Sequence, residues 1–389
     1  MKIIIFGGDG FCGWPLTLRL SKNSNKIMIV DNFLRRKIDQ ELGVKPIYPI
    51  YSLNQRIKTW KKITGKEILF KKIDLSKEIN KIEKLFYEFK PDAVVVLAEL
   101  KSAPYSVKSL SHSNRTITNN LLVNNNILHT IAKYNKNIHF VHIGTMGVYG
   151  YDYSKILIPD GYYKADLYNH LNQKITKKIL HPSSPGSIYH LSKAQDELLF
   201  QYYNKLYNLK ITDLHQGVVW GINTLETDMN EKLSNRFDYD GEYGTVLNRF
   251  IAQASIGYPL TVHGSGKQIR PIININNTVD CIEIALKYKY KSKRVRVLNQ
   301  LAETIRVVDI AKKISNLSGV KIDYQKNPRI ENENNKLKAK PIGLIELGLK
   351  PIYLDNNYLK KEIEKTKKHG NSIIRDKIKS KILWKKSKQ

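Results

Sequence analysis

Tyr189 and Lys193 are the two residues of this chain whose types and spacing point most directly to a reaction. They begin and end the segment YHLSK, four residues apart, and residues with that spacing lie on one face of a helix. A nearby ammonium group favours the phenolate, the form of tyrosine that takes a proton from a hydroxyl. Lowering a phenol pKa from about 10 to about 7 requires about 4 kcal/mol of preferential stabilisation of the phenolate. The pair therefore predicts proton transfer coupled to hydride transfer at a substrate carbon.

Thr145 belongs to the run GTMGVYG that follows an apolar stretch earlier in the chain. We expect Thr145 at the end of a strand, where its hydroxyl can hydrogen-bond the Tyr189 hydroxyl. A Tyr-x-x-x-Lys spacing arises often by chance in a chain with 23 tyrosines. The order of strand, threonine and helix, together with a cofactor loop near the N-terminus, favours a catalytic role over chance.

The cofactor loop follows the first apolar run. Gly7, Gly10 and Gly13 form G-x-x-G-x-x-G between a predicted strand and a predicted helix, where glycines let backbone N–H groups approach a pyrophosphate. Asp31 follows the next predicted strand, at the position of the acid that binds the adenosine ribose hydroxyls. An acid there repels a 2′-phosphate, so the pattern predicts NAD.

Further residues complete the predicted cofactor site. Arg35 and Arg36 leave NADP as the alternative, because an arginine there can accept a 2′-phosphate. Asp74, after the third predicted strand, either binds the adenine ring or is a surface acid. The other cofactor-binding residues that we predict are Phe11, Cys12, Asn32, Leu75, Lys101 and Asn119.

Short apolar runs alternate with helical stretches along the first part of the chain. Such alternation predicts an α/β fold with a doubly wound parallel sheet of the Rossmann type. The predicted strands are 2–6, 27–30, 68–70, 93–97, 138–143 and 209–214. The predicted helices among them are 11–22, 55–63, 79–89, 115–134 and 189–206.

Two regions fall outside this alternation. Residues 151–186 form an insertion, and the pattern loosens again beyond Gly221, with polar residues and glycines crowded between Thr224 and Gly244. We expect both stretches to make loops or lobes over the site. The predicted elements of the later region are a helix at 245–255, a strand at 260–263 and the apolar run 342–349 within a helix-rich remainder. We assign 1–220 to an NAD-binding Rossmann domain. Residues 221–389 then form mainly a smaller C-terminal substrate-binding lobe and a basic tail, with some segments returning to the Rossmann domain.

Composition limits the class of protein. The formal net charge of +30 over 389 residues suggests nucleic acid as a partner. Lysines are spread along the whole chain, apart from a concentration at 375–388, which argues against a nucleic-acid partner. Cys12 and Cys281 are too few for a disulfide framework or a closed zinc site, so we predict no metal and a reducing, cytoplasmic location. No window has the length of a membrane span.

At these motifs the chain resembles the extended short-chain dehydrogenase/reductase superfamily and, within it, the UDP-sulfoquinovose synthase family. The likeness covers most of the chain, and its motifs SAPYS, GTMG and YHLSK are more specific than the superfamily fingerprint. Other stretches that carry it are DGFCGW at 9–14, DN at 31–32, RR at 35–36, DLHQGVV at 213–219, RFDYD at 236–240, LNRF at 247–250 and NPR at 327–329.

The resemblance implies a reaction that joins UDP-glucose and sulfite into UDP-sulfoquinovose, with NAD tightly held. Tyr189 then takes the proton of the sugar 4-hydroxyl while hydride passes to NAD, and the resulting 4-ketone acidifies the C5 proton. Water leaves from C6 to give a 5,6-ene, sulfite adds, and hydride returns to C4. The superfamily also implies a homodimer.

The resemblance assigns roles to further residues. His190 is a proton carrier beside Tyr189, with a structural hydrogen bond as the alternative role. Arg329, assisted by Arg270, binds the UDP diphosphate, because a planar guanidinium matches phosphate oxygens. The implied substrate-binding residues are Lys101, Thr145, Tyr189, Gln216, Arg249, Arg270 and Arg329.

Some positions depart from related patterns. Sugar 4,6-dehydratases carry an Asp-Glu pair after the threonine, where this chain has Met146 and Gly147, which argues against dehydratase activity. Departures from the resembled family are Leu100 for Gln, Lys101 for Arg, Val148 for Glu, and Asn334 and Asn335 in a stretch with His and Tyr. These departures bear on the sulfite step more than on the oxidation. The alternatives are therefore another NAD-dependent UDP-sugar 4-epimerase or dehydratase, and a catalytically inactive NAD-binding scaffold.

Overall fold

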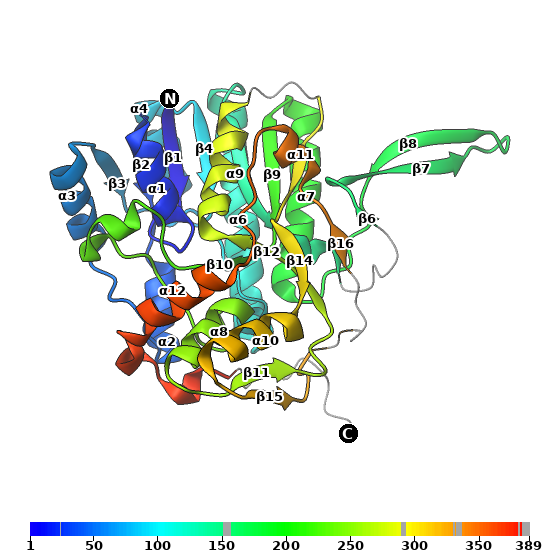
Figure 1. Ribbon diagram of the computed structural model, residues 1–389. Coiled ribbons are helices and arrows are strands. Elements are labelled where there is room, and N and C mark those ends of the chain that lie inside the picture. Colours follow the sequence, from blue (N-terminus) through cyan, green and yellow to red (C-terminus); the bar gives the residue numbers. More distant parts are fainter. Residues whose placement is uncertain are drawn as a thin grey trace.

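A seven-stranded parallel sheet lies at the centre of the molecule (Figure 1). The computed structural model describes residues 1–23, 25–150, 157–288, 293–329, 331, 337–379 and 382. The strands are β1 (Lys2–Phe6), β2 (Lys26–Val30), β3 (Ile68–Lys71), β4 (Ala93–Val96), β5 (His139–Thr145), β9 (Lys210–Gln216) and β13 (Arg296–Gln300). Their order is β13-β9-β5-β4-β1-β2-β3, with every neighbouring pair parallel. The chain order reverses between β1 and β4, which opens a crevice at the carboxyl ends of the strands.

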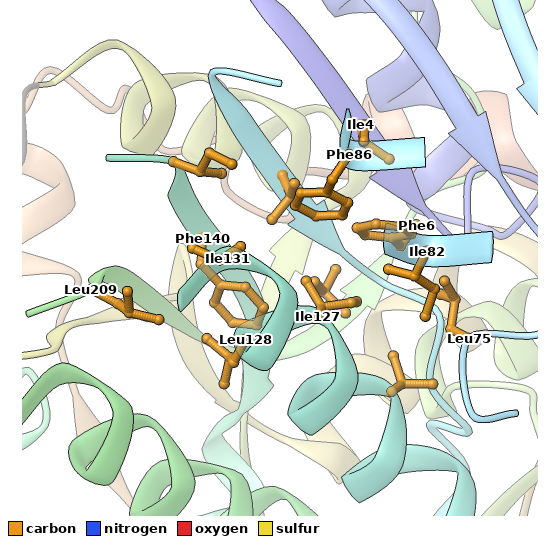
Figure 2. Close-up of a cluster of buried hydrophobic side chains, with 14 of the residues drawn as sticks. Ile4, Phe6, Leu75, Ile82, Phe86, Ile127, Leu128, Ile131, Phe140 and Leu209 are labelled. Atoms are coloured by element: carbon orange, nitrogen blue, oxygen red, sulfur yellow. The ribbon is translucent and has the colours of Figure 1, made fainter. Parts of the chain in front are cut away.

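Helices cover both faces of this sheet, because its strands are apolar on both sides. The helices of this domain are α1 (Gly13–Lys22), α2 (Leu34–Leu42), α3 (Leu53–Thr64), α4 (Ile79–Phe89), α5 (Ala103–Ser106), α6 (Leu110–Tyr134), α7 (Ile188–Tyr207) and α9 (Ile275–Lys287). Ile4 and Phe6 of β1 join a core with α4, α6 and α7, whereas Ile3 and Ile5 join a second core with α1 and α9. Figure 2 shows the first core, where Phe86 stacks on Phe6 with ring centroids 6.4 Å apart. The expected doubly wound Rossmann sheet is confirmed.

The second half of the chain builds a smaller lobe below the sheet in Figure 1. Its core contains Trp220, Phe237, Phe250, Ile310 and Leu359. Its strands are β10 (Val218–Trp220), β12 (Ile269–Asn274) and β14 (Glu303–Arg306) in one sheet and β11 (Leu260–His263) with β15 (Ile322–Gln325) in another. Its helices are α8 (Val246–Ser255), α10 (Val307–Ser318) and α12 (Asn356–Lys367), with short turns η2 (Thr227–Met229), η3 (Glu231–Leu233), η4 (Gly370–Ser372) and η5 (Arg375–Lys377).

The insertion after β5 forms a β-hairpin that projects from the body of the molecule (Figure 1). Its strands, β7 (Tyr162–Tyr168) and β8 (Lys174–Leu180), pair only with each other among the described strands. In their register Leu167 lies opposite Ile175 and Lys164 opposite Lys178, so one side of the hairpin is mostly apolar, apart from Lys177, and the other carries more lysines. The expectation of a lobe over the site is wrong for this hairpin, because its strands line no part of the cavity described below.

Several elements differ from those predicted. The Ser109 hydroxyl accepts a hydrogen bond from the His112 N–H, so α6 begins at Leu110 and not at 115. The prediction omits α2, and the helix-rich remainder also contains strands. Among them, β13 returns to the central sheet beside β9, and β16 (Lys338–Ala339) pairs with β6 (Leu157–Ile158). The apolar run at 342–349 contains the short helix α11 (Ile342–Glu346).

Two expectations from composition can be compared with the structure. Cys12 and Cys281 are both buried and free. None of the helices in the described ranges is long and apolar enough to cross a bilayer.

The stacked pair in Figure 2 allows a test of the core. We expect Phe86→Ala to lower the free energy of unfolding by about 3–5 kcal/mol, because it leaves a cavity in a filled core. The neighbouring Tyr87 is 67% exposed, so Tyr87→Ala should cost less than about 0.5 kcal/mol. Urea unfolding monitored by circular dichroism measures both, and similar losses for the two variants would contradict this packing.

Candidate active site

One cavity of ≈ 360 Å³ opens at the carboxyl ends of the parallel strands, between the sheet and the smaller lobe. It brings together most residues that the motifs single out. Those that line it are Gly7, Gly10, Phe11, Cys12, Gly13, Asp31, Asn32, Arg35, Leu75, Lys101, Asn119, Thr145, Tyr189, His190, Lys193, Gln216, Arg249, Arg270 and Arg329. Arg36 and Asp74 do not line it.

The glycine-rich turn between β1 and α1 forms one end of the cavity. Gly7 has φ +83°, and a Cβ there would lie 2.7 Å from the backbone nitrogen of Ala98. A Cβ at Gly13 would overlap the carbonyl oxygen of Gly7, so only glycine lets the turn close this tightly. The turn leads directly into the first turn of α1, a geometry that binds a pyrophosphate through backbone N–H groups.

Asp31 lies beside this turn at the end of β2. Its carboxylate accepts hydrogen bonds from the Asp9 N–H at 3.0 Å and the Phe33 N–H at 2.7 Å. Burial, with the nearby charge of Asp9, raises the pKa of Asp31 to about 6. An ionised carboxylate in this position fits the ribose hydroxyls of NAD.

Both arginines that suggested NADP are engaged in ion pairs. Arg36 binds the carboxylate of Asp9, with Nε 2.6 Å from Oδ2. Arg35 pairs with Asp39 and lies 3.1 Å from Asp238, and its guanidinium stacks on the Tyr243 ring. These contacts compete with a 2′-phosphate, so the residues present fit NAD better than NADP.

Asp74 lies outside the cavity. Its carboxylate accepts hydrogen bonds from the Ser76 hydroxyl at 2.7 Å and from the Ser76 N–H at 3.1 Å. This arrangement is a local turn, and it favours the surface interpretation of this acid over adenine binding.

Thr145 and Tyr189 meet at the cavity wall. Thr145 ends β5, and its hydroxyl hydrogen-bonds the Tyr189 side chain and accepts the Gly147 N–H at 3.1 Å. Tyr189 enters α7 just after the N-cap Ser187, and its own N–H donates to the Ser106 hydroxyl at 3.1 Å. Burial raises the pKa of Tyr189, while the hydrogen bond from Thr145 lowers it. Without further positive charge the tyrosine is therefore a neutral phenol.

His190 lies against Gly147, the position of the glutamate in sugar dehydratases. A Cβ at Gly147 would overlap the His190 imidazole, so the ring occupies the space that a side chain there would need. Burial, with the charges of Arg329 and Arg270, lowers the pKa of His190 to about 3. The imidazole is therefore neutral at physiological pH, and an anion bound beside Arg329 and Arg270 would raise its basicity by compensating their charge.

The side chains on either side of Gly147 are apolar and buried. Met146 is buried and lines the cavity as an apolar wall. Val148 is buried in a cluster with Tyr149 and Ile158 and does not line the cavity. The loss of a glutamate at 148 therefore removes no side chain from this cavity wall in the present arrangement.

Basic residues from the smaller lobe form the opposite wall. Arg249, Arg270 and Arg329 all line the cavity and act electrostatically on His263, whose pKa burial lowers to about 4. Arg270 is held by Glu331, with Nη1 2.6 Å from Oε1. Three guanidinium groups facing one cavity attract a diphosphate or another multiply charged anion.

Of the positions that depart from the resembled family, some line the cavity and others do not. Leu100 and Lys101 line the cavity, with the Lys101 ammonium 4.8 Å from the centroid of the Phe11 ring. Burial lowers the pKa of Lys101. Asn334 and Asn335 lie outside the described residues.

Glu99 is a cavity residue that our sequence reasoning missed. It lies three residues beyond the end of β4, lines the cavity and forms an ion pair with Lys193. The sequence feature that could have indicated Glu99 is an acid directly after the apolar run 93–98. That its partner is Lys193 could not be inferred from the sequence. Lys193 also donates to the Ile143 carbonyl at 2.8 Å.

These features define a class of enzyme. The profile of the NAD dependent epimerase/dehydratase family matches residues 3–299, and the chain belongs to this family. The chain is similar to the chloroplastic UDP-sulfoquinovose synthase of Spinacia oleracea, with 37% identity over 99% of this chain and 79% of the relative. It is also similar to the UDP-sulfoquinovose synthase of Sulfolobus acidocaldarius, with 33% identity over 90% of this chain and 88% of the relative.

Solved structures give the same fold. UDP-glucuronic acid 4-epimerase from Bacillus cereus, in complex with UDP-glucuronic acid and NAD, superposes with a TM-score of 0.70 at 21% identity, covering 95% of this chain and 99% of that one. UDP-glucose 4-epimerase from Thermus thermophilus, in complex with NAD, gives 0.64 at 20% identity over 96% and 100%. The predicted NAD-dependent, nucleotide-sugar-modifying class is confirmed by the family.

The two acids after β2 and β3 provide a matched test of the cofactor site. We expect Asp31→Ala to weaken NAD binding at least about tenfold, because the ribose loses a charged acceptor, and Asp74→Ala to change it less than about twofold.

The same site should respond to pH. Only the ionised carboxylate of Asp31 accepts hydrogen bonds from both ribose hydroxyls, and its pKa is about 6. The affinity of the unaltered protein for NAD should therefore fall about tenfold from pH 7 to pH 5. Calorimetric titration measures all three values, and equal losses at the two positions would contradict the assignment.

Proposed function

We propose that this protein converts UDP-glucose and sulfite into UDP-sulfoquinovose, with NAD held throughout. The observation that carries the proposal is the meeting of Tyr189, Thr145 and His190 at the wall of the cavity. The names of the two relatives at 37% and 33% identity support it. NAD, when bound, accepts the hydride of the sugar C4 and later returns it.

Tyr189 acts first, as the base for the sugar 4-hydroxyl. Its pKa is raised by burial, so the phenolate needs positive charge nearby, which Lys193 on the next turn of α7 and the oxidised cofactor supply. Thr145 keeps its hydroxyl directed at Tyr189 because its Oγ1 also accepts the Gly147 N–H. When hydride returns to C4, the same tyrosine gives the proton back.

His190 acts next, at C5 and C6. The ketone at C4 acidifies the C5 proton, which the neutral imidazole takes. The C6 hydroxyl leaves as water with the proton that His190 took from C5. Hydrogen sulfite then adds to C6 through its sulfur, and its proton passes through His190 to C5. The imidazole over Gly147 thus does the proton transfer for which a dehydratase uses a carboxylate.

The basic wall of the cavity holds the nucleotide. Arg329 and Arg249 carry the charge that the UDP diphosphate needs, and Arg270 is held in place by Glu331. Lys101, near Phe11, adds a cation within reach of the same cavity. Sulfite is itself an anion, so this wall raises its local concentration.

The reaction is tested by incubating the purified protein with UDP-glucose, with and without sulfite, and identifying the sugar nucleotide by mass and chromatography. UDP-sulfoquinovose formed only with sulfite supports the proposal. UDP-galactose would identify a 4-epimerase, and loss of water without sulfite a dehydratase. Absence of turnover with NAD bound would favour a scaffold.

Two variants separate the steps of the reaction. We expect His190→Asn to keep NAD reduction by UDP-glucose, measured at 340 nm, but to lose sulfonated product by about 10²–10⁴-fold, because only the proton transfer at C5 is removed. Tyr189→Phe should lose both signals, because no base remains for the 4-hydroxyl. Full product formation by either variant contradicts the role given to that residue.

We also propose that the enzyme is a homodimer through α6 and α7. These helices pack against each other and leave large apolar side chains exposed on their outer surface, namely Leu122, Leu198, Tyr202 and Leu206. A second copy of the same helix pair is an apolar, self-complementary partner.

The dimer can be tested by charge reversal of this surface. The double variant Leu198→Asp, Tyr202→Asp should sediment as a monomer, because each interface would bury four unpaired carboxylates in a two-fold dimer. Leu225→Asp, at a still more exposed leucine elsewhere, serves as the control and should keep the oligomeric state of the unaltered protein. A monomeric unaltered protein would overturn the proposal.

The expected location is the cytoplasm. Free, buried Cys12 and Cys281 suit a reducing compartment. The relative from Spinacia oleracea is named as chloroplastic, and a stroma-like reducing compartment would suit these thiols equally.

A further inference from the structure

The ammonium group of Lys193 is buried, with 3% of the residue exposed. It forms an ion pair with Glu99, donates to the Ile143 carbonyl at 2.8 Å and lies 3.0 Å from Nε2 of His142. Removing an ammonium from water costs several kcal/mol unless an opposite charge is close. The nearby carboxylate therefore decides whether this lysine carries its charge.

Glu99 is held where it meets Lys193. Its Oε1 accepts a hydrogen bond from Nδ2 of Asn124 on α6 at 2.7 Å, and its two oxygens lie 3.3 and 3.1 Å from Nε2 of His142. These contacts come from α6 and β5, so the carboxylate is fixed from two sides. Its position does not depend on the flexible end of the lysine.

His142 is held in turn by a buried row of charged groups. Its Nδ1 lies 2.8 Å from Oδ1 of Asp213, and Oδ2 of Asp213 lies 3.0 Å from Nε2 of His215. Glu197 then lies 3.0 Å from His215. The row follows adjacent strands β5 and β9 and ends on α7, the helix that carries Lys193.

We propose that Glu99 is the positioning residue that keeps Lys193 protonated and in place for its action on Tyr189, and that His142, anchored by Asp213, sets the place of Glu99. The proposal rests on the proposed function only through the role of Lys193 in oxidising the sugar. It explains why the carboxylate of Glu99 lines a cavity in which the proposed ligands, a diphosphate and sulfite, are anions.

The expected pH dependence follows from the groups that face Lys193. These are Glu99 beyond β4, His142 on β5, Asp213 on β9 and Asp196 on α7. Burial lowers the pKa of Lys193 to about 8, although Asp196 and Asp213 act to raise it. Removing the Glu99 carboxylate lowers the pKa of Lys193, because an adjacent negative charge favours a buried ammonium. Lys193 would then lose its proton at a lower pH than in the unaltered protein, and acid would restore it.

The test compares Glu99→Gln with the unaltered protein in NAD reduction by UDP-glucose across pH. We expect the kcat of Glu99→Gln, divided by that of the unaltered protein, to fall at least about threefold between pH 5.5 and pH 7.5. Glu99→Asp should restore most of the kcat that is lost at pH 7.5. Glu197→Gln is the control, because it removes a buried carboxylate of the same row that does not contact Lys193. Its ratio should not change with pH.

A direct measurement accompanies the kinetics. In protein labelled with ¹⁵N-lysine, the Nζ resonance absent from Lys193→Arg reports the Lys193 titration, and Glu99→Gln should move its midpoint to lower pH. An unchanged midpoint, or a kcat ratio independent of pH, overturns the proposal. Failure of the unaltered protein to reduce NAD would instead contradict the proposed function, while leaving the Nζ titration to decide the role of Glu99.

Discussion

The carboxyl ends of five parallel strands meet at one edge of the sheet, and the arrangement of the cavity depends on that constraint. Residues far apart in the chain line one cavity because each ends or follows its own strand: Gly7, Asp31, Glu99, Thr145 and Gln216. The reversal of strand order between β1 and β4 separates the helices on the two sides and leaves room for an extended ligand. The smaller lobe then needs only to close the open side.

The charges around the cavity are divided between its walls. The lobe contributes guanidinium groups, which face anionic ligands, whereas the sheet contributes buried carboxylates, which compensate Lys193 and the histidines behind it. Opposite charges at short distance hold α7, which carries Tyr189 and Lys193, in register with β5 and β9. The large positive charge of the chain thus coexists with a locally acidic interior.

Local patterns predict those features that depend on neighbours in the chain. The strand, the glycine turn and Asp31 could be found because each signal lies within a few residues, and the YHLSK spacing indicated a helical face. Glu99 and His142 could not be paired in advance, because their contacts join different strands. The same limit applies to β13, which returns to the sheet from the second half of the chain. The hairpin β7–β8 was missed since its alternation is interrupted by lysines.

The contact between Gly147 and His190 has a consequence for how such sites diverge. A side chain at 147 and an imidazole at 190 require the same space, so the two positions are alternatives. A carboxylate introduced at 147 alone would displace the histidine before it could replace its function. A side chain at 147 therefore requires the imidazole at 190 to shift, which couples the two positions. Exchange between a carboxylate-based site and this one would then involve both positions together.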